Sequence, residues 1–331
     1  MTAAPTLDVV ALGHPLVDVL AHETDDVVAR IGVERGAMTM VDAARSDDIY
    51  AQLGPAQETS GGSAANTAVG VASFGGRAAF IGRIADDTFG KVFAHDLRNA
   101  GVEFDVSPAT DGSPTGRCLV IVAADAERTM CTYLGAGAEI DPHDVDADRI
   151  SSAAVTYLEG YLWDEPGAKD AIRRAASLAR DAGRKVALTL SDPFCVERHR
   201  DEFRTLMERD VDVLFANEHE ITMLYEVDAF DEAARRVADV CEIAALTCGP
   251  QGSVIVGHGE RHAIDADPVQ RLVDTTGAGD LYAAGFLFGL THRRDLATCG
   301  RLASLAAAEV ISHLGARPEA SLAEQAAALL A

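Results

Sequence analysis

The stretch VDTTGAGDLYAAGFLFGL, residues 273–290, places Gly277 and Gly279 around Ala278 and ends its loop on Asp280. The letters RLVDT before the glycines favour the end of a strand, and the apolar positions after Asp280 recur near helical spacing. The glycines are therefore expected at a strand-to-helix turn. Free backbone N–H groups at the start of a helix, with no Cβ on two of the residues, form a site for an anion.

The acid at position 280 decides what such a site can do. The charge of Asp280 suits the helix dipole, but it would repel a bound phosphate. A carboxylate beside an anion site can accept the proton of a substrate hydroxyl while the N–H groups neutralise a transferring phosphoryl group. The pattern thus indicates phosphoryl transfer to an alcohol. The alternative, an aspartate that caps its own helix beside a tight turn, stays open.

Two other phosphate-binding motifs are excluded. A dinucleotide fingerprint would need Gly or Ala where Tyr282 stands, and it should open the first strand-helix unit of the chain. A Walker loop is approached only by ADDTFGKV, which has Ala85 in place of the first glycine and Val92 in place of the final hydroxyl residue.

A second glycine loop, SGGSAANTAVGVASFGG, spans residues 60–76. Gly62 permits close approach of the backbone, and Ser63 and Asn66 offer short hydrogen-bonding groups that suit sugar hydroxyls. Ser63 as a helix cap and Asn66 as a turn residue are equally compatible with this loop taken alone.

Strand-length apolar runs alternate with alanine-rich helical stretches along most of the chain, which predicts an α/β fold with a largely parallel sheet covered by helices on both faces. Residues 15–45 and 113–135 break this pattern, because they are rich in Val, Thr and Ile with little helical period. We expect them to form a small β-lid. Residues 1–14, 46–112 and 136–331 are assigned to the large domain.

Composition narrows the class of protein. The 331 residues carry a formal net charge of −24, with a pI near 4.6 and only three lysines, which argues against nucleic acid or an anionic membrane as a partner. No apolar run reaches the roughly 18 residues of a membrane span, and the N-terminus lacks the features of a signal peptide. A cytoplasmic protein acting on a small molecule, as a monomer or homodimer, is expected. The six cysteines show no metal-ligand spacing and are expected to be reduced and mostly buried.

The two glycine loops together resemble the paired signatures of the PfkB, or ribokinase-like, family of carbohydrate and nucleoside kinases. The likeness extends to GHPLVDVLA at the start, FANEHE and TCGPQGS in the middle, and AAAEVISHLGARP near the end, in the family's order. Within the family, GHPLVD, ERTMCTYLGAGA and LSDPFCVERHRDEF resemble segments of adenosine kinases. One departure is His14, which replaces the asparagine usual there. The resemblance implies a ribokinase-like three-layer α/β/α fold with a mostly parallel central sheet, and it implies ATP and Mg²⁺ as cofactors.

The resemblance also assigns roles to residues. It makes Asp280 the catalytic base and the backbone of Gly277, Ala278 and Gly279 the anion hole. The other catalytic candidate is Arg128, which matches a lid arginine that reaches the transferring phosphates, as a planar fork suits. An alternative for Arg128 is a surface cation.

The resemblance further implies three binding sets. The ribose hydroxyls would be held by Asp18, Gly62, Ser63 and Asn66, and the base would lie against Leu16 and Tyr161. Tyr161 and Trp163 are expected on one strand face by the period of two, where either ring could instead belong to the core. The ATP set comprises Asn217, Glu220, Thr247, Gly249 and Gly252, with Asn217 and Glu220 ordering Mg²⁺ through its waters. Asp274 and Thr276 match positions near a monovalent-cation site, for K⁺ for example, but could simply shape the turn.

The leading hypothesis is therefore ATP-dependent phosphorylation of a nucleoside 5′-hydroxyl, with adenosine first. A kinase for ribose, fructose or a related sugar, or for guanosine or inosine, is the sibling alternative. A nucleoside-binding module without transfer activity is the alternative from another class.

Overall fold

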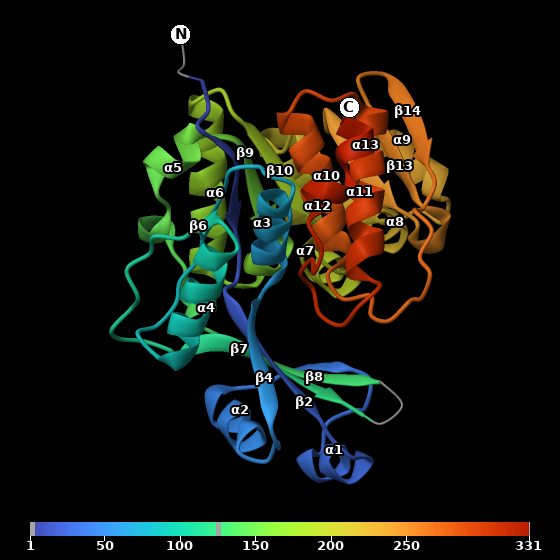
Figure 1. Ribbon diagram of the computed structural model, residues 1–331. Helices are drawn as coiled ribbons and strands as arrows, with labels where there is room; N and C mark the ends of the chain where they lie inside the picture. Colours follow the sequence, from blue (N-terminus) through green and yellow to red (C-terminus); the bar gives the residue numbers. More distant parts are fainter. Residues whose placement is uncertain (1–3, 124–126, 331) are drawn as a thin grey trace.

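A nine-stranded sheet forms the centre of the larger part of the molecule (Figure 1). The computed structural model describes residues 4–123 and 127–330. Neighbouring strands follow the order β14-β13-β12-β11-β10-β9-β1-β5-β6, and only the β12–β13 and β13–β14 pairs are antiparallel. The strands are β1 (Leu7–Leu12), β5 (Ala78–Ile81), β6 (Val102–Glu103), β9 (Ala153–Glu159), β10 (Lys185–Thr189), β11 (Val213–Asn217), β12 (Ile243–Thr247), β13 (Ser253–Gly257) and β14 (Glu260–Ile264).

Helices cover both faces of this sheet, which confirms the three-layer α/β/α fold. The strands are buried on both sides: Val9 and Ala11 of β1 face one core, and Val10 and Leu12 face the other. The first core is shared with α3 (Ser63–Ser73), α4 (Thr88–Asn99), α10 (Ala278–Thr291), α11 (Leu296–Val310) and α12 (Leu322–Gln325). The second is shared with α5 (Ala147–Ser152), α6 (Pro166–Asp181), α7 (Pro193–Asp210), α8 (Glu218–Tyr225) and α9 (Phe230–Ala238). The remaining helical elements are α13 (Ala327–Leu330) and the 3₁₀ turns η1 (Ala136–Glu139), η2 (Pro142–Asp144), η3 (Gly160–Asp164) and η4 (Gly249–Gln251).

A second sheet of five strands lies at one end of the large sheet, in the order β3-β8-β7-β2-β4 (Figure 1). Its strands are β2 (Leu16–His22), β3 (Met38–Met40), β4 (Ala56–Gly61), β7 (Thr115–Val122) and β8 (Arg128–Gly135). The period of two sorts its side chains: Val17 and Val19 join the core, whereas Leu16, Asp18 and Leu20 face the cavity between the two sheets.

The expected lid segments correspond to part of this small sheet, with two differences. Residues 56–61, placed with the large domain by the sequence, form β4 and pair with β2. The sequence AQETSG lacks the branched apolar residues that mark a strand, because four of its six residues are at least partly exposed at the edge of the sheet.

The second difference is helical. Residues 15–45 were expected to be strands, but α1 (Asp25–Ile31) lies among them and α2 (Ala43–Tyr50) begins there. Val28 and Ile31 of α1 pack into the same core as the outward face of the small sheet. A helix of seven residues offers too few apolar positions for its period to be visible in sequence. None of the helices in the described ranges is long and apolar enough to cross a membrane.

Candidate active site

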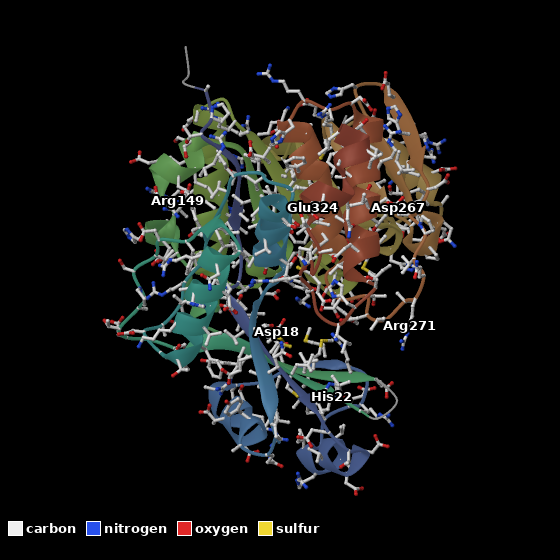
Figure 2. The ribbon with its side chains drawn as sticks, in the orientation of Figure 1. Asp18, His22, Arg149, Asp267, Arg271 and Glu324 are labelled. Atoms are coloured by element: carbon white, nitrogen blue, oxygen red, sulfur yellow. The ribbon has the colours of Figure 1, made fainter. Side chains whose placement is uncertain are left out.

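A cavity of about 1520 Å³ lies between the large domain and the small sheet. It is lined by both glycine loops, by the inward face of the small sheet and by the carboxyl ends of strands in the large sheet. The carboxyl ends of parallel strands are where α/β sheets usually bind ligands. Asp18 lies where the two sheets meet, as Figure 2 shows.

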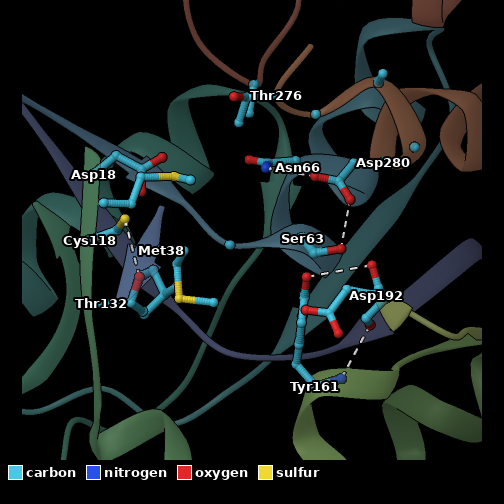
Figure 3. Close-up of a pocket in the computed structure, with 18 of the residues that line it drawn as sticks. Asp18, Met38, Ser63, Asn66, Cys118, Thr132, Tyr161, Asp192, Thr276 and Asp280 are labelled. Carbon is cyan, nitrogen blue, oxygen red and sulfur yellow. Dashed lines mark hydrogen bonds between the residues drawn. The ribbon is translucent and has the colours of Figure 1, made fainter. Parts of the chain in front are cut away.

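Asp280 joins the two glycine loops. Ser63 Oγ donates to Asp280 Oδ1 over 2.6 Å, and Asn66 Nδ2 donates to Asp280 Oδ2 over 3.0 Å (Figure 3). Thr67 Oγ1 adds a bond to the backbone oxygen of Asp280 over 3.1 Å. Two segments separated by more than 200 residues are thus held together around one carboxylate.

The protonation of Asp280 is set by its surroundings. Burial raises the pKa of Asp280 to about 6, and the charge of Glu159 acts in the same direction. The hydrogen bonds from Ser63 and Asn66 oppose this rise in the pKa, because they favour the ionised form. A carboxylate in this state can take up a proton near neutral pH.

The turn before Asp280 has the open amides of an anion site. Gly277 caps α10 with φ 80°, and a Cβ there would lie 2.7 Å from Ala316 Cα, so only glycine fits. Nothing lies within 4 Å of a Cβ built at Gly279. The N–H of Ala278 donates to Thr275 O over 3.2 Å, which makes Ala278 the poorest of the three expected anion-hole donors.

RLVDT, residues 271–275, is not the strand that the sequence indicated. The segment runs as an irregular loop, and it is fixed by Val273 N, which donates to Ile311 O over 2.9 Å at the end of α11. The glycine turn therefore joins a loop, not a strand, to its helix.

Arg128 reaches this turn from the first residue of β8. Its Nη2 lies 2.8 Å from Asp274 Oδ2, and its Nη1 donates to Thr276 Oγ1 over 3.1 Å. Arg128 is therefore not a surface cation, because 14% of its side chain is exposed. Asp274 also accepts from the N–H and hydroxyl of Thr276 and from Gly315 N, so it shapes the turn.

The acceptor candidates gather on the other side of Asp280. Asp18, Gly62, Ser63 and Asn66 all line the cavity. A Cβ at Gly62 would lie 2.2 Å from His14 O, so this glycine lets two backbone segments approach. Burial raises the pKa of Asp18 to about 6, against the charges of two nearby arginines. This carboxylate is partly exposed to the cavity and can accept from ligand hydroxyls.

An apolar slot adjoins Asp18. The side chains that line it come from alternate positions on the strands of the small sheet and are mainly aliphatic or sulfur-containing: Leu16, Leu20, Met38, Met40, Cys118, Val120, Met130 and Leu134. Met38 and Met40 are about half exposed, although both are large apolar residues. Only Leu16 among these was expected from sequence. Alternate residues of TGRCLVIV and RTMCTYLG lie on the same face of their strands. This period would have identified further slot residues if the sequence had shown which face lines the cavity.

Tyr161 lines the cavity, but Trp163 does not. The two residues were expected on one face of a strand, yet both lie in the 3₁₀ turn η3, where residues two apart point in different directions. Trp163 is buried in the second core against Phe203, whereas Tyr161 N donates to Ser191 Oγ at the cavity wall (Figure 3).

A buried pair that the sequence did not indicate lies under the acceptor loop. His14 Nδ1 is 3.0 Å from Glu159 Oε1, and Ala64 N donates to Glu159 Oε2 over 2.9 Å. Both side chains are 2% exposed. Where His14 replaces the asparagine of the resembled family, it is thus tied to a carboxylate at the end of β9.

The ATP candidates lie at the ends of β11 and β12. Asn217, Glu220 and Thr247 line the cavity, while Gly249 and Gly252 shape the turn between β12 and β13 with φ 56° and 86°. Asn217 and Glu220 form a capping box: Asn217 Oδ1 accepts from Glu220 N over 2.8 Å, and Glu220 Oε2 accepts from Asn217 N over 2.9 Å. Burial raises the pKa of Glu220 to about 7.

Comparisons with known proteins show which proteins this chain resembles as a whole. The model of the pfkB family of carbohydrate kinases matches residues 37–322. The crystal structure of adenosine kinase from Sinorhizobium meliloti is 49% identical, with a TM-score of 0.90 over 97% of this chain and 99% of that chain. A probable sugar kinase protein from Rhizobium etli CFN 42 is 46% identical, with a TM-score of 0.91 over 98% of this chain and 99% of that chain. Adenosine kinase from Saccharomyces cerevisiae is 28% identical over 333 residues, covering 94% of this chain and 96% of its own length. The chain therefore belongs to the pfkB family of carbohydrate kinases and is an ATP-dependent kinase with a hydroxyl group as its acceptor.

Proposed function

We propose that the protein transfers a phosphoryl group from ATP to the 5′-hydroxyl of a nucleoside, adenosine first. The observation that carries the choice of acceptor is the apolar slot beside Asp18. A ribose needs hydrogen-bonding groups, whereas a purine also needs an apolar or aromatic surface to cover its faces. Thioether side chains such as those of Met38 and Met130 make favourable contacts with flat rings. A free sugar would leave these methionines without a ligand to cover them.

In this proposal the ribose hydroxyls lie against Asp18 and Asn66, which brings the 5′-oxygen toward Asp280. Asp280 accepts the proton of that oxygen as it attacks, in keeping with a raised pKa of about 6. The free amides of Gly277 and Gly279 at the start of α10 face the negative charge that develops during transfer. The guanidinium of Arg128, now bound to Asp274, stands close enough to the turn to add a second source of positive charge.

ATP and Mg²⁺ supply, when bound, the transferable group and the neutralisation of its charge. The residues at the ends of β11 and β12 are compatible with ATP and Mg²⁺. Within residues 4–123 and 127–330, no group of three or more His, Cys, Asp or Glu could hold a metal ion. In the proposed assignment, Asn217 and Glu220 would order Mg²⁺ through its waters while they cap α8. Thr247 would border the nucleotide. For K⁺, the oxygens of Asp274 already have protein partners, so we propose turn shaping as the role of Asp274 and Thr276.

The test is a panel of acceptors in an assay that measures ADP formation with Mg²⁺, with and without K⁺. Adenosine, guanosine, inosine, ribose and fructose are compared by kcat/KM. We expect adenosine to be preferred, because it fills both the hydroxyl site and the apolar slot. Preference for ribose or fructose over every nucleoside would overturn the proposal.

A sugar acceptor is the second candidate, because the Rhizobium etli relative is described as a probable sugar kinase. A third candidate is a module that binds a nucleoside without transferring a phosphoryl group, and calorimetry distinguishes it from a kinase. Adenosine binding without ADP formation would favour that module, and the intact set of Asp280, its two partners and the open amides argues against it.

A further inference from the structure

A guanidinium enters the cavity from the loop that follows α11. Arg317 lines the cavity, and the two residues before it are fixed against the glycine turn. Gly315 N donates to Asp274 Oδ2 over 3.0 Å, and Ala316 packs so tightly on Gly277 that no Cβ fits between them. The turn that forms the anion site therefore also delivers Arg317 to the acceptor side of the cavity.

Arg317 is bound to the second glycine loop. Its Nη1 donates to Ser60 Oγ, and its Nε donates to Asn66 Oδ1 over 3.3 Å. Ser60 is itself held by Asp96, whose Oδ2 accepts from Ser60 N over 3.1 Å. A guanidinium can only donate, so Asn66 must turn its oxygen toward Arg317. Its amide nitrogen is then free to donate to Asp280.

One guanidinium nitrogen of Arg317 lacks a hydrogen-bond partner among the described residues. Nη2 is buried and has no hydrogen-bond partner, and no carboxylate of the described chain lies within ion-pair distance of Arg317. Burial lowers the pKa of Arg317 to about 10, so the group stays charged at neutral pH. A buried charged donor without a partner is costly. The charges of Asp18 and Asp96 act against this lowering of the pKa and favour the charged form of Arg317.

We propose that Arg317 determines acceptor specificity by donating from Nη2 to a hydroxyl oxygen whose hydrogen is accepted by Asp18. A hydroxyl is both donor and acceptor, so a carboxylate and a guanidinium together recognise it completely. The chemical class is an acceptor with vicinal hydroxyls, such as the 2′,3′-diol of a nucleoside. Through Asn66, Arg317 is also a positioning residue for Asp280. The inference rests on the proposed function, since the ribose of the acceptor supplies the diol.

The test compares wild type with Arg317→Met on adenosine, 2′-deoxyadenosine and 3′-deoxyadenosine. For the hydroxyl that Arg317 contacts, we expect removal of either partner to lower kcat/KM on the order of 10- to 100-fold. Removal of both should cost little more than removal of one, because the interaction is already lost. The matched control is Arg301→Met on α11, an exposed arginine that bonds Thr298 and does not line the cavity. Arg301→Met should leave the ratio of kcat/KM between adenosine and each deoxyadenosine unchanged.

Positioning has a separate readout. Arg317→Met should also lower kcat several-fold for all three nucleosides, including the one that lacks the contacted hydroxyl. Arg317→Lys keeps the charge but cannot donate to Ser60 and Asn66 as a fork. It should therefore restore part of the loss in KM and little of the loss in kcat. Thermal unfolding of each variant separates these effects from misfolding, and the lysine variant carries the test if the methionine variant does not fold.

The proposed contact would be overturned if removal of the 2′-hydroxyl and removal of the 3′-hydroxyl each lowered kcat/KM by the same factor in wild type and in Arg317→Met. An unchanged kcat would overturn the positioning. Failure of the proposed function looks different, because the wild type itself would then prefer another acceptor in the panel. In that event the same cycle is run with ribose and 2-deoxyribose, or by calorimetry where no transfer occurs.

Discussion

At the scale of single residues, the proposed mechanism depends on two carboxyl groups whose pKa values lie unusually high. Burial raises the pKa of both Asp280 and Asp18 to about 6, and the charge of Asp280 contributes to the rise at Asp18. A base must be ionised to accept a proton, so activity is lost as pH falls through these values.

We therefore expect kcat/KM to rise with pH and to reach half of its plateau near pH 6. Glu159 contributes to the raised pKa of Asp280, so Glu159→Gln should move the acidic limb to lower pH. Asp280→Asn should lose at least roughly two orders of magnitude in kcat while still binding the nucleoside. Profiles between pH 4.5 and 8.5 check both points. An acidic limb that is unchanged in Glu159→Gln would contradict this account of the pKa.

The same carboxyl should destabilise the folded protein. The pKa of Asp280 is about 6 in the folded state against 3.8 as its ordinary value, so the folded state holds the proton more tightly. The contribution of Asp280 to stability therefore falls as pH rises from about 4 to 6, and the full penalty remains above pH 6. The free energy of unfolding of Asp280→Asn, relative to wild type, should therefore be higher at pH 7.5 than below pH 4, on the order of 2 to 3 kcal/mol. Denaturant unfolding of both proteins at both pH values measures this change, and a stability difference that does not vary with pH would refute it.

At the scale of elements, α8 begins at a cap that also faces the cavity. Asn217→Ala should cost about 1 kcal/mol of stability, because Oδ1 no longer accepts from Glu220 N. If Asn217 also orders Mg²⁺ and phosphates, the KM for ATP should rise as well, while the KM for the acceptor stays constant. Asp295→Ala is the matched control. Asp295 caps α11 by accepting from Thr298 N over 2.8 Å, and it does not line the cavity. Equal KM values for ATP in Asn217→Ala and Asp295→Ala would show that Asn217 only caps α8 and does not contribute to ATP binding.

Elements also explain what the sequence could predict. The alternation of buried strands and helices in the large domain follows from periods that any single segment displays, so the three-layer fold was predictable. β4, α1 and η3 were missed, because their sequences are short or polar and only their neighbours in space decide their conformation. The two glycine loops could be found by residue type. The buried pair of His14 and Glu159 joins positions 145 residues apart, and no local pattern signals it.

At the scale of the whole molecule, the negative net charge presents a problem for a kinase that must bind ATP, because ATP is itself an anion. The chain carries a formal net charge of −24. Among the described residues that line the cavity, the only arginines are Arg128, Arg198 and Arg317, and there is no lysine. A polyanionic substrate must therefore be met by a few local cations in an acidic surround. In the proposed assignment Arg317 serves the acceptor, which leaves Arg128 as the cation bound at the glycine turn.

Arg128 also joins the small sheet to the large domain, because β8 carries it and its partner Asp274 lies before α10. Its loss should therefore weaken charge stabilisation and the closure of the cavity together. We expect Arg128→Ala to lower kcat on the order of 100-fold, as removal of one donor to a transition-state charge commonly does. Arg128→Lys should recover only part of this, since an ammonium cannot bridge Asp274 and Thr276 as a fork. Arg30→Ala is the control, because Arg30 is an exposed arginine on α1 that bonds Gln52 beside the same sheet. Steady-state kinetics with ATP varied at saturating acceptor measures the effect, and an Arg128→Ala enzyme as active as Arg30→Ala would show that the ion pair with Asp274 is structural alone.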